Sequence, residues 1–425
     1  MRNHILIVGM GPVGLLLACK LSLNEYLNIT IIDGESESYI TREYYQASFL
    51  HKKSVDILST LNLWEEIKND LNFNFDVKYF IQEKCVYNNN FNKFGCAIFS
   101  HYKLIQSLLK ECKSKNNIKI VFNAKINKII NNSNGTINAN FIINNCEDLN
   151  ILSFQTPKTQ ETYYSNNDIN SAFEMKKDAN NYCLYEKQYE YIFGCDGAKS
   201  TVRKLMGCNF TYKEGKKWTV YDFHIPDIGN KIKGMNWFID ENPCMYISCN
   251  KDHFRFETYC ENNIETNFQN INNYLTTKYI PYQIISLLNK TNLIRTSTYT
   301  MYNNISNSFQ SYNNNIFLVG DSAHTIVPFS GMGVTIGFED VIYITNNFNN
   351  LTMYTDDRRK KIINYQKRAS FLDIIIHLLI NQNTNKIYLK ILSTIIKCIV
   401  NIIKILPYFL NKIIFRIFQN YILHI

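Results

Sequence analysis

The first 33 residues constrain the fold more than any other part of the chain. An apolar run over residues 5–8 leads into the turn Gly9-Met-Gly-Pro-Val-Gly14, and a second apolar run of helical length follows. A further apolar segment, residues 29–32, ends on Asp33, nineteen residues after Gly14. In a dinucleotide-binding βαβ unit the glycines admit a pyrophosphate and let the helix approach the strand, and the acid binds a ribose hydroxyl. This order of elements predicts an α/β fold that begins with such a unit.

Two later segments repeat the pattern of a buried strand that ends on glycine and aspartate. The strand predicted over residues 191–194 runs into Asp196 and a short basic helix, and the strand predicted over residues 316–319 ends at Gly320-Asp321. A loop and a further helix follow the second pair. Glycine at a strand exit lets the backbone approach a ligand, and an aspartate accepts a hydrogen bond from a hydroxyl. We therefore expect both loops to line the same ligand site as the first turn.

Together the three segments resemble the family of single-component FAD-dependent aromatic hydroxylases, the flavoprotein monooxygenases. That family has a GxGxxG turn, a central Asp-Gly loop and a late Gly-Asp loop in this order, and the resemblance covers residues 1–370. Residues 194–203 and 324–340 are most similar to the kynurenine 3-monooxygenase branch. The resemblance implies a Rossmann-like FAD-binding domain interrupted by a mostly antiparallel-sheet substrate domain, with a C-terminal helical tail.

The expected domains alternate along the chain. The FAD-binding domain is expected at 1–75, 99–207 and 313–370, the substrate domain at 76–98 and 208–312, and the tail at 371–425. Apolar periodicity predicts helices over 54–67 and 101–112 and strands over 77–81, 84–87 and 118–122. The polar region 131–181 is expected to hold an elaborated hairpin with a long loop.

The resemblance assigns specific residues to FAD. They are Gly9, Gly11, Val13 and Gly14 at the pyrophosphate, Ile32, Asp33, Gly34 and Glu35 at the adenosine ribose, Ile126 at the adenine, Asp196 and Thr201 near the cofactor, Gly320 and Asp321 at the ribityl chain, and Val334 and Thr335 at the isoalloxazine. His101 stands where the family usually places an arginine directed at the FAD phosphates, and neutral histidine is the weaker anion partner. Three alternatives remain: Glu35 as the ribose acid in place of Asp33, Asp321 as a loop cap, and Thr201 without a ligand.

The chemistry also follows from the resemblance. FAD is expected to stay bound while NADPH reduces it and leaves, and O2 then forms a flavin C4a-hydroperoxide that hydroxylates an electron-rich aromatic substrate. L-kynurenine, converted to 3-hydroxykynurenine, is the specific expectation. Pro328, Gly331 and Gly333 are expected on the reactive side of the flavin. The cofactor carries the chemistry, so neither a Ser-His-Asp nucleophile nor a metal site is needed.

Substrate contacts are expected from four residues, Lys78, Tyr87, Asn383 and Tyr408. Kynurenine-type enzymes hold the substrate carboxylate with an arginine in a substrate-domain strand, and Lys78 is the nearest basic residue here. Since Val77 and Tyr79 alternate with it, Lys78 is expected to be the cation that this strand presents inward. Each of the four has a structural alternative: an exposed lysine, a packed tyrosine or a helix-surface asparagine.

Two other functions remain open. One is a hydroxylase or epoxidase of a quinone precursor or lipid-like substrate, which the apolar, basic tail favours. The other is a flavin-binding protein without hydroxylase activity, which His101 and Thr335 leave possible. The sequence has neither an interleaved aromatic-basic pattern nor a nucleic-acid motif, so no nucleic-acid partner is expected.

The tail has a composition of its own. No acidic residue follows Asp373, and six of the net nine positive charges lie there on one helical stripe of about 120°. Packed helices, a basic amphipathic segment on a membrane surface and a spanning helix are the alternatives. Twelve scattered cysteines and an apolar strand that starts near residue 4 indicate an intracellular protein, cytoplasmic or peripheral on an organelle membrane.

Overall fold

The computed structural model describes most of the chain. The described residues are 3–43, 47–62, 64–81, 84–144, 174–177, 182–211, 217–232, 234–238, 243–248, 251–260, 286, 288, 292–328 and 331–380, with seven isolated positions after residue 393. Two of the expected substrate residues, Asn383 and Tyr408, and the long loop expected within 131–181, lie wholly or largely outside this set.

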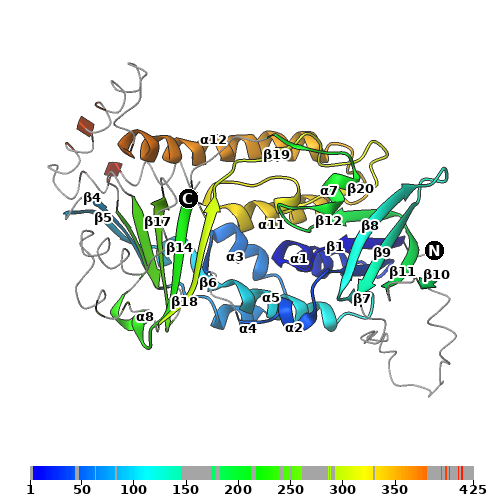
Figure 1. Cartoon of the computed structure of the whole chain (residues 1–425), viewed down its shortest axis with the longest axis horizontal. Helices are drawn as coiled ribbons and strands as arrows, with labels where there is room; N and C mark the ends of the chain where they lie inside the picture. Colours follow the sequence, from blue (N-terminus) through cyan, green and yellow to red (C-terminus); the bar gives the residue numbers. More distant parts are fainter. Residues whose placement is uncertain are drawn as a thin grey trace.

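A five-stranded parallel sheet organises the right half of the molecule in Figure 1, with the strand order β20-β12-β1-β2-β7. Its strands are β1 (Asn3–Val8), β2 (Leu27–Ile32), β7 (Ile118–Val121), β12 (Tyr191–Gly194) and β20 (Ile316–Leu318). Of the strands expected before the two later loops, β12 thus pairs directly with β1, and β20 pairs with β12 at the edge of the sheet. Ile5, Leu6 and Ile7 of β1 are fully buried, as continuous apolar strands are when both faces of a parallel sheet are covered.

Helices and a second sheet cover these strands. Helix α1 (Pro12–Leu21) packs between α5 (His101–Lys113) and α11 (Gly333–Asn346). An antiparallel sheet of order β10-β11-β9-β8 adds another layer and contacts β1. Its strands are β8 (Ala124–Asn131), β9 (Ile137–Asn144), β10 (Glu174–Lys177) and β11 (Tyr182–Tyr189). The hairpin that was expected after residue 131 is the β8–β9 pair and its continuation.

A seven-stranded sheet of order β18-β14-β17-β16-β15-β4-β5 forms the left half of Figure 1. Its strands are β4 (Asp76–Ile81), β5 (Lys84–Asn90), β14 (Lys217–His224), β15 (Met235–Phe238), β16 (Cys244–Ser248), β17 (His253–Cys260) and β18 (Leu293–Thr300). All neighbours are antiparallel except β15 and β4. The mostly antiparallel second sheet expected from the sequence is therefore present.

The two faces of this sheet meet different partners. We call one the inner face, because Val77, Met245 and Ile247 on it pack with Phe49 and Ile98, which belong to strands β3 (Ala47–Leu50) and β6 (Ala97–Ser100) beside the parallel sheet. The opposite, outer face packs its aromatic residues on the short helix α8 (Ile228–Lys231). The inner face is thus the one turned toward the glycine-rich loops.

Two expectations about elements need correction. The single helix expected over 54–67 is two helices, α3 (Lys52–Leu58) and α4 (Trp64–Asn69). The hydroxyls of Ser59 and Thr60 donate to the carbonyls of Asp56 and Ile57 at 2.7 Å each, so side-chain hydrogen bonds compete with helix continuation. The tail boundary expected at 370 falls inside one long helix, α12 (Tyr354–Ile380).

The remaining elements are short. They are α2 (Glu37–Ile40), η1 (Asn92–Phe94), α7 (Thr201–Leu205), β13 (Phe210–Thr211), β19 (Ile305–Ser306) and η3 (Gly320–Ser322). Within the part of the chain that the structure describes, no helix is both long enough and apolar enough to cross a membrane.

Candidate cofactor and substrate site

The first glycine turn holds Asp33 in place. Gly9 has a φ of +108° and donates its N–H to the Ile32 carbonyl at 2.8 Å. The carboxylate of Asp33 accepts hydrogen bonds from the N–H groups of Met10, at 2.7 Å, and Glu35, at 3.0 Å. Burial raises the pKa of Asp33. The acid at the end of β2 is therefore fixed beside the turn, as a ribose-binding residue requires.

The three glycines of the turn have different environments. A Cβ atom on Gly14 would overlap the carbonyl oxygen of Gly9, and a Cβ on Gly9 would overlap the Cys195 carbonyl. A Cβ on Gly11 would meet no atom of the described part of the chain within 4 Å. Gly9 and Gly14 are thus demanded by the packing of the chain on itself. Gly11 borders open space at the N-terminus of α1, which is where a pyrophosphate would need room.

Two helix N-termini offer unused N–H groups at this place. Gly11 precedes α1 and Met332 precedes α11, and neither helix has a side-chain cap or an acid in its first turn among the described residues. Val13 of α1 joins the two, because a Cβ on Gly337 would lie 2.6 Å, and one on Gly320 3.2 Å, from Val13 Cγ2. The first turn and the late loop therefore meet, and both helix ends carry the partial positive charge that suits an anion or an electron-rich ring edge.

The two aspartates of the later loops differ in role. Asp196 Oδ2 accepts from the N–H groups of Thr201, at 2.6 Å, and Val202, at 3.1 Å, and so caps α7. Asp196 Oδ1 is buried and has no hydrogen-bond partner among the residues that the structure describes. Asp321 is exposed to solvent at its side chain, yet the surrounding protein raises its pKa by desolvation. Asp321 is thus free to bind a hydroxyl, while Asp196 has one oxygen left over for a ligand.

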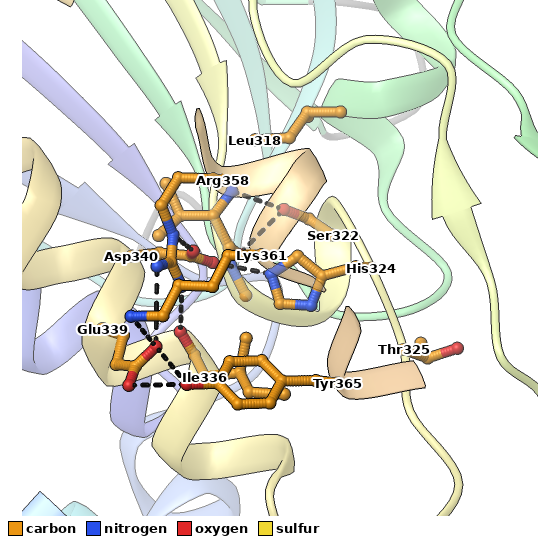
Figure 2. Close-up of polar contacts among 12 residues, drawn as sticks. Leu318, Ser322, His324, Thr325, Ile336, Glu339, Asp340, Arg358, Lys361 and Tyr365 are labelled. Carbon is orange, nitrogen blue, oxygen red and sulfur yellow. Dashed lines mark hydrogen bonds and ion pairs between the residues drawn. The ribbon is translucent and has the colours of Figure 1, made fainter. Parts of the chain in front are cut away.

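A buried ionic cluster supports the late loop from behind (Figure 2). Asp340 Oδ2 accepts from the Gly320 N–H at 3.0 Å and lies 2.7 Å from His324 Nε2, while Asp340 Oδ1 accepts from Arg358 Nε at 2.6 Å. Arg358 also donates to the Ile336 carbonyl at 3.2 Å. Although burial opposes it, Arg358 and His324 bring the pKa of Asp340 down to about 2. We call these residues the Asp340 cluster.

Helix α12 extends this support along the loop. Glu339, next to Asp340, pairs with Lys361 at 2.9 Å and accepts from the Tyr365 hydroxyl at 3.1 Å, as Figure 2 shows. The Gln366 amide donates to the carbonyls of Asn304 and Thr325, both at 2.8 Å. One helix thus holds the backbone from the Gly-Asp turn to the segment just before Pro328.

The other residues expected at FAD have definite places. Burial lowers the pKa of His101, the first residue of α5, to about 4, so this side chain is neutral at pH 7. Ile126 is buried in the core. The Thr335 hydroxyl accepts from Ser54 Oγ at 2.9 Å inside the protein, which leaves the backbone of Thr335 as its ligand-binding group. Gly34 packs against the Lys125 side chain.

The residues expected at the reactive side lie on the loop before α11. Pro328 is exposed, and a Cβ on Gly331 would lie 3.0 Å from Phe49 Cβ, so this loop reaches β3. A Cβ on Gly333 would meet no atom within 4 Å among the described residues. Open space therefore borders both Gly11 and Gly333, at the two helix N-termini.

The orientation expected for Lys78 is wrong. In the register of the sheet Lys78 aligns with Asn236, and its neighbours in sequence, Val77 and Tyr79, belong to the inner-face cluster. Lys78 therefore lies on the outer face, away from the late loop, 4.0 Å from the Asp76 carboxylate. Tyr87 does lie on the inner face, opposite Tyr79, but it is fully buried and accepts from the Asn89 amide at 2.7 Å.

The inner face carries charged residues that were not expected. Arg255 donates to Asp222 Oδ1 from Nε at 2.8 Å and lies 3.5 Å from Glu257, while His253 lies 2.8 Å from the same Asp222 oxygen. Although burial opposes it, His253 and Arg255 hold the pKa of Asp222 below its ordinary value. The signal was present in residues 253–257, His-Phe-Arg-Phe-Glu, because strand alternation puts the three ionisable residues on one face.

Comparisons with known proteins bear on the same regions. Residues 165–364 match the family model described as FAD binding domain. The chain is 48% identical over 56 residues to a kynurenine 3-monooxygenase of Christiangramia forsetii. It is 24% identical over 159 residues to a 3-(3-hydroxy-phenyl)propionate/3-hydroxycinnamic acid hydroxylase of Burkholderia cenocepacia. These matches cover 13% and 37% of this chain, and 12% and 28% of the relatives.

Solved structures resemble the chain over nearly its whole length. The p-nitrophenol 4-monooxygenase of Pseudomonas putida has a TM-score of 0.67 at 14% identity, with coverage of 95% of this chain and 98% of that one. PqsL of Pseudomonas aeruginosa, described in complex with 2-aminobenzoylacetate, has a TM-score of 0.68 at 11% identity, with coverage of 93% and 100%. At these identities the likeness establishes the fold, and the shared arrangement is a Rossmann-type domain with a second sheet.

Proposed function

Because the chain belongs to the family of FAD-dependent aromatic hydroxylases, the flavoprotein monooxygenases, we propose that it binds FAD and uses NADPH and O2 to hydroxylate an aromatic substrate. The observation that carries this proposal is the meeting of the first turn and the late loop at Val13, which brings two uncapped helix N-termini together. FAD, when bound, supplies the redox chemistry and the activation of O2.

The residues present fit FAD. The open space at Gly11 and the first N–H groups of α1 suit the pyrophosphate, and Asp33 suits the adenosine ribose. The exposed carboxylate of Asp321 suits the ribityl hydroxyls, and the backbone N–H groups of Val334 and Thr335 suit the edge of the isoalloxazine. The unpaired oxygen of Asp196 is a further acceptor in the same neighbourhood.

The protein's own contribution is to orient the ring and exclude water. Trp218 is buried against Val327, the residue before Pro328, with Tyr259 and Tyr299 beside it. These aromatic side chains on the inner face stand next to the loop expected at the flavin, so an aromatic substrate would be held between them and FAD. Such a dry, aromatic enclosure favours oxygen transfer over release of peroxide.

For the substrate, a kynurenine-type amino acid remains the first candidate. It is supported by the similarity of the chain to a kynurenine 3-monooxygenase over 56 residues. A phenolic acid is the second, because the similarity to a 3-(3-hydroxy-phenyl)propionate/3-hydroxycinnamic acid hydroxylase extends over 159 residues. NADPH would reduce the flavin without a domain of its own, since the sequence has one GxGxxG βαβ unit.

The test begins with the purified protein. We expect it to be yellow, to hold non-covalent FAD, and to be bleached by NADPH without oxygen and without a partner reductase. Aerobic incubation with L-kynurenine, 3-(3-hydroxyphenyl)propionate and 4-hydroxybenzoate, followed by mass spectrometry, should reveal one product heavier by an oxygen atom. Asp321→Ala should lose the colour. Peroxide without any hydroxylated product would instead identify a flavin oxidase, and folded protein that takes up no FAD would overturn the proposal.

The tail adds a proposed membrane contact. The exposed isoleucines 399, 402, 413 and 414 lie among its basic residues. Each basic residue near an anionic surface adds about 1 kcal/mol of attraction, beside the burial of apolar side chains. Binding to phosphatidylserine vesicles should weaken with salt, and a chain truncated after Asn383 should keep FAD and lose the vesicles. Full-length protein that ignores such vesicles would argue for a tail packed on the core.

A further inference from the structure

The inner face of the seven-stranded sheet is ordered in rows across the strands. The register aligns Val220, Glu257 and Met245 on β14, β17 and β16, and Met245 in turn aligns with Trp237 on β15. Since aligned residues share a face, Glu257 is an acid set among apolar and aromatic side chains. The row beside it carries Asp222 and Arg255.

This row lies next to the late loop. Trp218 and Met301 form one apolar cluster with Val327, and Trp237, Tyr259 and Tyr299 pack against that cluster. Tyr299 connects it to the acid, because its hydroxyl donates to Glu257 Oε2 at 3.2 Å. Glu257 therefore stands one side chain behind the aromatic surface that faces the segment before Pro328.

Asp222 and Glu257, the two acids of the inner face, differ in how many hydrogen bonds and ion pairs their carboxylates make. Asp222 is fully buried, and its carboxylate lies within 2.8 Å of His253, accepts two hydrogen bonds from Arg255 and lies 4.0 Å from Arg295. Glu257 is 9% exposed, and among the residues that the structure describes it accepts from the Tyr299 hydroxyl and lies 3.5 Å from Arg255. A carboxylate has about four acceptor positions. Glu257 thus keeps acceptor capacity at the edge of an aromatic enclosure.

We propose that Glu257 accepts a hydrogen bond from a hydroxyl or amino group on the substrate ring and is thereby the side chain that selects for this group. The inference rests on the proposed function and assigns the part of its site that selects the substrate. A ring is attacked by electrophilic oxygen faster when its substituent donates electrons, and a carboxylate that accepts the substituent's proton strengthens this donation. Binding selectivity and chemistry then depend on one side chain.

The test compares ligands that differ by the donor group alone. The FAD-loaded protein is titrated calorimetrically with 3-(3-hydroxyphenyl)propionate and 3-phenylpropionate, and with 2-aminobenzoylacetate and benzoylacetate. In at least one pair the donor ligand should bind about tenfold more tightly or better, as charge-assisted hydrogen bonds allow. In Glu257→Gln this preference should fall to less than about threefold, while FAD content and the affinity for the ligand without the donor stay unchanged.

Two further variants keep the test decisive. Glu66→Gln, an exposed acid on α4 paired with Lys110 at 2.7 Å, is the matched control and should keep the full preference. Tyr299→Phe removes a competing donor from Glu257, so the preference should be retained or increase, and this variant replaces Glu257→Gln if the latter does not fold. Loss of the preference in Tyr299→Phe would make the Tyr299 hydroxyl the acceptor and overturn the inference.

The outcomes separate this inference from the proposed function. Equal binding within both pairs, or a preference that persists in Glu257→Gln, would overturn the role of Glu257 while aromatic hydroxylation could still be observed in the product assay. Failure of all four ligands to bind, together with no hydroxylated product, would overturn both. A preference present in the natural sequence and absent in Glu257→Gln alone supports the assignment.

Discussion

The late loop and the inner face of the second sheet are built by different means. Where the late loop meets the first turn, the groups offered to a ligand are mostly backbone: two uncapped helix N-termini and the open space at Gly11 and Gly333. On the inner face they are side chains of residues brought together from four strands, such as Glu257 and Tyr299. A site made of backbone groups can be recognised in the sequence by the spacing of its glycines. A site made of side chains from several strands can be recognised only by the alternation of residues within each strand.

The two regions also treat buried charge in opposite ways. Asp340 supports the late loop as an ionised group, with a pKa lowered to about 2 by Arg358 and His324 against the effect of burial. Burial raises the pKa of Glu257, and its contact with Arg255 compensates only in part. A fixed charge suits a scaffold that must not move, whereas an incompletely satisfied acid suits a surface that a substrate completes.

The largest effect is expected in the glycine turn. Gly14→Ala should yield little folded protein and no bound FAD, because the new Cβ overlaps the Gly9 carbonyl oxygen. The new Cβ of Gly11→Ala meets no atom within 4 Å in the described residues, so the unfolding free energy of the FAD-free protein should change by less than about 1 kcal/mol. Its FAD affinity should nevertheless fall by about tenfold or more. Flavin absorbance measures FAD binding, and urea denaturation measures the unfolding free energy. Unchanged FAD affinity in Gly11→Ala would show that the pyrophosphate does not bind at Gly11.

A smaller but still large effect is expected in the Asp340 cluster. Asp340→Asn removes the nearer of two carboxylates paired with the buried Arg358, leaving Glu339 at 3.5 Å, and should reduce the unfolding free energy by about 3 kcal/mol. FAD should be lost in parallel, since the Gly320 N–H loses its charged acceptor. Asp356→Asn, an exposed acid on the same helix as Arg358, is the control and should change stability by less than about 0.5 kcal/mol. If Asp340→Asn and the natural sequence had equal unfolding free energies, the Asp340 cluster would contribute no more than an exposed ion pair.

The pH dependence of stability should have opposite signs in the two regions. The folded-state pKa of Asp340 is about 2 against an ordinary 3.8, so its contribution is complete above about pH 4 and is lost as the pH falls toward 2. The difference corresponds to about 2 kcal/mol. The raised pKa of Glu257 means that its ionisation costs stability as the pH rises above the ordinary 4.5. Denaturation measured from pH 2 to 8 should therefore show two changes. In Asp340→Asn the loss of stability between about pH 4 and pH 2 should be smaller than in the natural sequence. Glu257→Gln should be more stable than the natural sequence at pH values well above 4.5.

The smallest effect is expected for Lys78. Because Lys78 lies on the outer face with Asp76, Lys78→Met should change the KM for any hydroxylated substrate by less than about twofold. Steady-state kinetics with the substrate found in the product assay provides the measurement. A rise of more than tenfold, with FAD content unchanged, would return the substrate carboxylate to Lys78 and contradict the contrast between the two faces.

The sequence predicted the parallel sheet and the places of its loops well, because each loop combines a glycine requirement with an apolar strand. Asp33 binds the first turn at Met10, and Gly320 packs against Val13 of the same turn region, as that pattern predicts. For the second sheet, the sequence predicted only that it is mostly antiparallel. Whether Lys78 or Arg255 faces the loops depends on how the sheet docks, and alternation within one strand carries no information on docking. The Asp340 cluster was equally hidden, since Asp340 and Arg358 pair across the turn between two helices.

Helix α12 contacts the late loop and its supporting segment through residues at fixed spacings along the helix. Residues 358, 361, 365, 366 and 370 all contact the loop or its supporting segment along one side of this helix. A one-residue insertion between 361 and 365 would rotate the later part of the helix by about 100° and remove Gln366 from both carbonyls. Related chains should therefore tolerate insertions and deletions after residue 370 but almost none between residues 358 and 370. The spacing of these contact residues along α12 should indicate whether a related chain keeps the late loop in the same position.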